Sequence, residues 1–157
     1  MKIAIAADHR GFLLKKKMIP IVRRLGFAVN DLGTYSTRPV DYPDCAEAVG
    51  SSLINHDADR GILICGSGVG VAIAANKMPG IRACLCHDTY SAHQGVEHDH
   101  MNVLVLGALV VSEKLAEELV RAFLNAHFDE LPRHIRRLRK LENLEHHYCP
   151  SSTTDAA

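Results

Sequence analysis

The sequence lacks the features that would mark a membrane, secreted or nucleic-acid-binding protein. No apolar run approaches the length of a membrane span, and the start Met-Lys-Ile-Ala-Ile leads straight into an expected strand instead of a signal peptide. The 18 basic residues balance the 18 acidic ones, so there is no electrostatic reason to expect a nucleic acid or an anionic membrane as partner. We therefore expect a cytoplasmic protein that binds neither.

Patterns typical of disulfide frameworks and metal sites are also missing. The 5 cysteines are an odd number in a chain without an export signal, which argues against a disulfide framework. Cys84 and Cys86 are two apart on an expected strand, where they would share one face and suit core packing. The histidines at 98–100 and 146–147 lack the i, i+4 helical spacing with a third ligand that would indicate zinc. We expect no metal.

The most informative segment is 60–78, where an apolar run breaks into glycines and then resumes at helical spacing. The run at 62–64 is typical of a strand buried on both faces, and Pro79-Gly80 ends the helix that follows. Cys65 is therefore expected at the carboxyl end of a strand. The loop after it presents backbone N–H groups at a helix N-terminus, which favours anion binding, and it consists of Gly66, Ser67, Gly68, Val69 and Gly70.

Other interpretations of this segment are open. A lone intracellular cysteine is most often a small core residue. The glycine run lacks the Gly-Lys-Ser/Thr ending of a P-loop, and its third glycine comes one residue early for a dinucleotide-binding fingerprint. Nucleotide binding is therefore the weaker hypothesis.

Strands and helices alternate at short spacing along the chain. We expect strands at 2–7, 27–31, 62–64, 81–86 and 103–106. We expect helices at 11–25, 44–56, 112–126 and 131–144, one after the glycine loop, and a short one from His87 that becomes a polar loop before Asn102. This order predicts an α/β fold with three α/β/α layers around a five-stranded parallel sheet, in one domain at 1–148 with a disordered tail at 149–157.

In such sheets ligands bind at the carboxyl ends of the strands. Asp8 and His9 follow the first strand, Cys65 and Ser67 follow the central one, and we expect the loop ending at His98 at the same edge. A thiol, imidazoles and an anion-stabilising loop suit proton abstraction next to a carbonyl. Hydrolysis with a cysteine nucleophile competes, and would require an imidazole hydrogen-bonded to the thiol.

Several motifs together resemble those of the type B ribose-5-phosphate isomerases, in the sugar-phosphate isomerase family that also includes galactose-6-phosphate isomerase. The resemblance covers residues 1 to about 145 and rests on Asp8-His9, Asp41-Tyr-Pro43, Ile64-Cys-Gly-Ser-Gly-Val-Gly70, Ala74-Ala-Asn-Lys77, Pro79-Gly-Ile-Arg-Ala83, His98, Asn102 and Arg133-His-x-x-Arg137. It implies a Rossmann-like aldose–ketose isomerase without cofactor, acting on a phosphorylated sugar. It also implies a homodimer, or a tetramer, whose active sites use both subunits.

The resemblance also implies roles for individual residues. Cys65 would shuttle a proton between C1 and C2 of ribose 5-phosphate and ribulose 5-phosphate, while Ser67 and the loop N–H groups would stabilise the enediolate. His98 would open the furanose ring, aided by Asp8. Substrate contacts are further expected from His9, Gly66, Gly68, Val69, Gly70, Asp99, Arg133 and Arg137, with His9 and the two arginines on the phosphate.

Two positions depart from the family pattern. Asp99 replaces a common asparagine, which adds an acceptor-only charge near an anionic substrate. Leu109 replaces a common phosphate-binding arginine, a loss that Arg136 or Lys140 could compensate. Two alternatives therefore stay open. One is isomerisation of another phosphorylated sugar, such as an allose, galactose or tetrose phosphate, and the other is a non-catalytic phosphate- or nucleotide-binding module.

Overall fold

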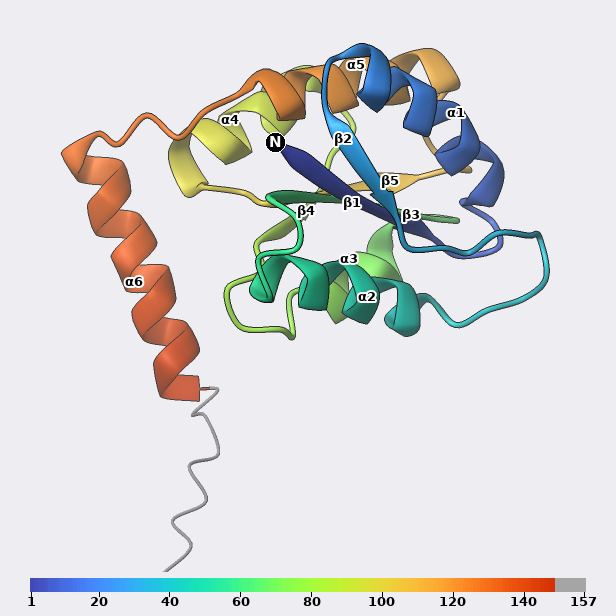
Figure 1. Cartoon of the computed structure of the whole chain (residues 1–157). Coiled ribbons are helices and arrows are strands. Elements are labelled where there is room, and N and C mark those ends of the chain that lie inside the picture. The colour runs from blue at the N-terminus through green and yellow to red at the C-terminus, as the bar shows by residue number, and fades with distance from the viewer. Residues whose placement is uncertain (149–157) are drawn as a thin grey trace, which may run out of the picture.

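The computed structural model describes residues 1–148, which form a parallel sheet with helices on both faces (Figure 1). The strands are β1 (Lys2–Ala7), β2 (Ala28–Asp31), β3 (Arg60–Cys65), β4 (Ala83–Leu85) and β5 (Val103–Gly107). The helices are α1 (Phe12–Arg24), α2 (Tyr42–Ile54), α3 (Val69–Ala75), α4 (Thr89–Asp99), α5 (Glu113–Asn125) and α6 (Pro132–Tyr148). The 5-stranded sheet has the order β2-β1-β3-β5-β4, and every pairing is parallel, which confirms the predicted fold class.

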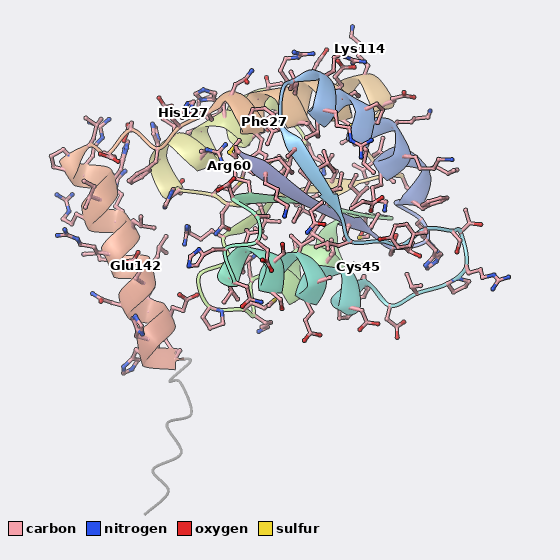
Figure 2. All side chains as sticks on the ribbon, viewed as in Figure 1. Phe27, Cys45, Arg60, Lys114, His127 and Glu142 are labelled. Atoms are coloured by element: carbon pink, nitrogen blue, oxygen red, sulfur yellow. The ribbon has the colours of Figure 1, made fainter. Side chains whose placement is uncertain are left out.

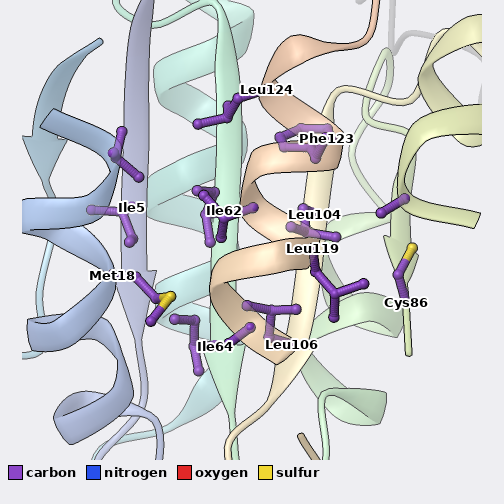
Figure 3. Packing of buried hydrophobic residues seen from close by; sticks show 14 of the residues in the cluster. Ile5, Met18, Ile62, Ile64, Cys86, Leu104, Leu106, Leu119, Phe123 and Leu124 are labelled. Carbon is purple, nitrogen blue, oxygen red and sulfur yellow. The ribbon is translucent and has the colours of Figure 1, made fainter. Parts of the chain in front are cut away.

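The apolar run of β3 divides its side chains between two cores. Ile62 and Ile64 pack with Leu119 and Phe123 of α5, in the cluster that Figure 3 shows between the strands and that helix. Leu63 alternates with them and packs against α2 and α3 on the other face. Since side chains alternate along a strand, only an uninterrupted apolar run fills both cores.

Helix α4 is longer than expected, and this changes the position of His98. The Asp88 carboxylate caps the helix by accepting the backbone N–H of Ser91 at 2.7 Å, and the helix continues to Asp99, with His100 as its C-cap at φ 54°. In this right-handed α/β arrangement the helix runs back from the carboxyl edge of the sheet to the amino edge. The expectation that His98 lies at the carboxyl edge of its own chain is therefore wrong.

Helix α6 extends away from the layered body (Figure 1). Of its residues only His134 is buried, and side chains such as Glu142 project on every side of the helix in Figure 2. Glu145 accepts a hydrogen bond from the Gly80 N–H at 2.8 Å. The tail predicted at 149–157 lies outside the described residues, and no helix among 1–148 has both the length and the apolar character of a membrane span.

Candidate active site

Cys65 lies at the end of β3 with its sulfur turned toward the glycine loop. Its side chain is buried, and Sγ accepts the backbone N–H of Gly68 at 3.1 Å. Gly68 has φ 85°, and a Cβ at this position would lie 2.4 Å from Cδ1 of Leu85. Only glycine allows this left-handed turn, which directs an N–H onto the sulfur. The sequence-based placement of Cys65 at a strand end beside the loop is thus confirmed.

The other buried cysteines among residues 1–148 are Cys45 and Cys86, and their surroundings differ from those of Cys65. Burial, with Asp8 and Asp44 adding to it, raises the pKa of Cys45 to about 11, and burial beside Cys84 and Asp88 raises that of Cys86 to about 12. Their thiols instead donate to backbone carbonyls, at 3.9 Å and 3.7 Å respectively. Both are protonated near neutral pH. Cys65 differs from both because its sulfur accepts a backbone N–H, which makes it the best candidate for a reactive thiol.

Asp8 and His9 stand at the end of β1, beside Cys65. Asp8 is 7% exposed, and its Oδ1 accepts the backbone N–H groups of Arg10 at 2.9 Å and Gly11 at 2.8 Å. The Val40 N–H donates to Nδ1 of His9 at 3.3 Å. The neutral His9 ring therefore has its proton on Nε2, as a hydrogen-bond donor to an anion requires.

A second cluster forms around His98 at the amino edge of the sheet. The ring of His98 packs against that of His134, with centroids 4.1 Å apart. Nδ1 of His134 lies 2.7 Å from Oδ1 of Asp129, and Nε of Arg133 donates to Nε2 of His134 at 3.0 Å. Because Nε2 accepts, the proton of His134 is on Nδ1 and is donated to Asp129.

Sequence reasoning missed His134 and Asp129. The signal for His134 was its place inside the Arg133-His-x-x-Arg137 pattern. Nothing distinguishes Asp129, on the connection before α6, from other surface acids in the sequence. Burial alone would raise the pKa of Asp129, but hydrogen bonds from His134 and the Leu131 N–H outweigh it and lower that pKa below its ordinary value.

His98 and Asp99 share a contact with Gln94. Nε2 of Gln94 lies 2.8 Å from Nδ1 of His98 and donates to Oδ2 of Asp99 at 3.4 Å. Nε2 of His98 is 3.7 Å from the Glu97 carboxylate, and 31% of the His98 side chain is exposed. His98 is thus held on one face and accessible on the other.

Potential ligand atoms of His98, Asp129 and His134 lie within 4.8 Å of one another, a donor set that zinc can use. However, both ring nitrogens of His134 already have partners, Asp129 on one side and the Arg133 guanidinium on the other. A cation would have to displace that guanidinium. The contacts therefore favour a hydrogen-bonded network over a metal centre.

The two clusters lie at opposite edges of the sheet. Cys65 pairs with Gly107 at the carboxyl end of β5, whereas Gly61 pairs with Val103 at the amino end. These pairs are separated by about 13 Å along the strands. Asp8, His9, Ser67 and the glycine loop lie on the Cys65 side, while Asp99, Arg133 and Arg137 lie on the His98 side. A single chain therefore does not bring all the predicted site residues together.

The proteins to which this chain is similar include several that are named as isomerases. The family model described as Ribose/Galactose Isomerase matches residues 3–141. Ribose-5-phosphate isomerase B of Escherichia coli is 42% identical over 144 residues, which are 92% of this chain and 96% of that protein. D-erythrulose-4-phosphate isomerase of Pectobacterium atrosepticum is 39% identical over 133 residues, covering 82% of this chain and 86% of that protein.

A solved structure agrees with this relationship. Ribose-5-phosphate isomerase B of Clostridium thermocellum superposes with a TM-score of 0.91 at 42% identity, over 94% of this chain and 99% of that one. Both chains are thus matched almost from end to end. The chain belongs to the Ribose/Galactose Isomerase family.

Proposed function

We propose that this chain interconverts ribose 5-phosphate and ribulose 5-phosphate without a cofactor. The observation that supports this best is the Gly68 N–H on the sulfur of Cys65, in a fold shared at TM-score 0.91 with a ribose-5-phosphate isomerase B. A thiolate beside a loop of N–H donors is suited to removing a proton next to a carbonyl and holding the resulting oxyanion.

In this mechanism His98, assisted by Asp8, opens the furanose ring. The Cys65 thiolate then takes the proton from C2 of the aldehyde and returns it to C1, while the proton of the C2 hydroxyl passes to the oxygen on C1. The intermediate is an enediolate, whose charge the loop N–H groups and the Ser67 hydroxyl stabilise. Ser67 is exposed, so its hydroxyl is accessible to a bound substrate.

The phosphate is bound by His9, Arg133 and Arg137. The Nε2–H of His9 follows from the Val40 contact on its other nitrogen. Arg133 already has its Nε fixed by His134, which leaves the outer nitrogens of the guanidinium for a forked contact with phosphate oxygens.

The working unit of the proposal is a homodimer with shared active sites. In a two-fold dimer the His98 cluster of one copy can face the Cys65 cluster of the other, which completes two equal sites. This arrangement explains why the two clusters of one chain lie at opposite ends of its strands. It also gives His98 and Cys65 a common substrate.

Helix α6 supports the dimer independently. A helix of 17 residues with a single buried side chain gains little from its own body, since helices in proteins are stabilised mainly by packing of an apolar face. Leu141 and Leu144 are 45% and 54% exposed on α6. A second copy of the chain would cover them while bringing Arg133 and Arg137 to its partner's phosphate.

A relative named D-erythrulose-4-phosphate isomerase makes a tetrose phosphate the second candidate substrate. The test is a panel assay of kcat/KM with ribose 5-phosphate, D-erythrulose 4-phosphate, allose 6-phosphate and galactose 6-phosphate. We expect the highest value for ribose 5-phosphate. A higher value for another sugar would reassign the substrate, and no turnover with any of them would contradict the isomerase proposal.

A further inference from the structure

The side chain of Arg10 extends from the loop after β1 across the glycine loop after β3. A Cβ on Gly66 would lie 3.0 Å from Cδ of Arg10 and 3.7 Å from Cδ1 of Leu109. The backbone N–H of Arg10 is fixed by Oδ1 of Asp8 at 2.9 Å. The Asp8 carboxylate, which shapes the loop after β1, thus also fixes the backbone of Arg10. The aliphatic part of the Arg10 side chain packs over Gly66, which has no side chain to exclude it.

The Arg10 guanidinium is exposed and, within residues 1–148, has neither a hydrogen bond nor an ion pair. Some other arginines of this chain use theirs on the protein, whereas exposed ones such as Arg23 likewise have no side-chain partner within residues 1–148. Arg60 donates to the carbonyls of Phe123 and Ala126, for example, and Arg24 pairs with Glu117. A cation without a protein partner at the edge of an anion-binding loop is available for a ligand.

Leu109 provides the other side of this space. Its side chain is 72% exposed, and its N–H donates to the Gly66 carbonyl at 3.0 Å, so it stands directly beside the loop without offering a charge. Arg136 and Lys140 were the expected substitutes for an arginine at position 109. Both are on α6, on the His98 side of this chain and not on the side of the glycine loop. Arg10, in contrast, lies near the same Cβ position of Gly66 as Leu109 does.

We propose that Arg10 binds the phosphate of the substrate, with its stem supported by Gly66 and Leu109. This inference rests on the proposed function. Arg10, in the loop after β1 beside His9, would supply the positive charge that Leu109 lacks. Residues 10 and 109 together would then determine the affinity for phosphorylated sugars.

The test compares Arg10→Ala, Arg10→Lys and Arg23→Ala, with inorganic phosphate as a competitive inhibitor of the isomerase. Arg23 is the matched control, since it is an exposed arginine at the far end of α1. We expect Arg10→Ala to raise both KM and the phosphate inhibition constant by roughly 10- to 100-fold, as for a lost charge-assisted contact. Arg10→Lys should lose less, and Arg23→Ala should match the wild type.

Introducing Leu109→Arg into the Arg10→Ala variant should recover part of the affinity, because both positions adjoin Gly66. The proposal is overturned if Arg10→Ala keeps the wild-type inhibition constant, or loses affinity no more than Arg23→Ala. An inactive wild type that fails to bind phosphate would instead contradict the proposed function. Circular dichroism and thermal melting of Arg10→Ala identify a folding defect, in which case Arg10→Gln provides the same comparison.

Discussion

The ring of His98 rests on the buried ring of His134, whose two nitrogens are engaged by Asp129 and Arg133. His134 is 1% exposed and both of its ring nitrogens have protein partners, so neither nitrogen is free to contact a substrate. It therefore links the residue proposed to open the sugar ring with one proposed to bind the phosphate. This arrangement makes His134 a positioning residue.

Replacing His134 with Phe should keep the stacking surface but remove both hydrogen bonds. We expect kcat with ribose 5-phosphate to fall up to about 100-fold, because misplaced catalytic groups cost rates of that order. Erythrose 4-phosphate cannot close a furanose ring, so its turnover, if the enzyme accepts it, should fall less. Equal losses for both sugars would show that His134 does not act through ring opening.

Asp129 should contribute to stability in a pH-dependent manner. Its pKa is lowered in the folded protein, so its contribution is present above the unfolded pKa of about 3.9 and is lost as pH falls through the lower folded value. Thermal melting of the wild type and Asp129→Asn should therefore differ most near neutral pH and converge as the pH falls through the lowered pKa of Asp129. A constant difference between the two melting curves would show that this carboxylate does not titrate as described.

Cys65→Ala should abolish isomerisation while leaving folding and substrate binding largely intact. A general base contributes about 10²–10⁴-fold, and more is lost when no other group replaces it. Cys45→Ala is the matched control, because that thiol is also buried but has a raised pKa. Turnover by Cys65→Ala at the level of Cys45→Ala would remove Cys65 from the mechanism.

Arg137→Ala should weaken binding of phosphorylated sugars and leave binding of unphosphorylated ribose unchanged. The expected loss is about 1.5–3 kcal/mol, as for a hydrogen bond to a charged group. Arg139→Ala, on another side of the exposed helix α6, is the control. Calorimetric titration with both ligands separates the cases, and an equal loss for both would indicate a structural role of Arg137.

The fold and the Cys65 half of the site could be predicted because their signals are local. An apolar run of strand length, a glycine loop and a helix follow one another at 60–75. The alternation of strands and helices predicts a parallel sheet, which places this loop at the carboxyl ends of the strands. Asp8 and His9 followed from the same rule. These elements need no contact with distant segments to be recognised.

The His98 half could not be predicted in the same way. The end of α4 depends on the left-handed conformation of His100 and on packing around Gly95, where a Cβ would lie 3.2 Å from Sδ of Met101. The role of His134 depends on the rings and charges that surround it after folding. A sequence pattern places Arg133 and Arg137 on one helix face but does not show which way that helix leaves the body.

Each proposed active site combines Cys65 of one subunit with His98 of another. The most direct test of this arrangement is the activity of mixed dimers formed by co-expressing Cys65→Ala and His98→Ala chains, with dimer formation checked by differently tagged subunits. Each variant alone should be inactive, whereas the mixture should recover about a quarter of the wild-type sites, since a mixed dimer places both lesions in one site and leaves the other intact. Mixed dimers that form and remain as inactive as the separate variants would contradict the shared site.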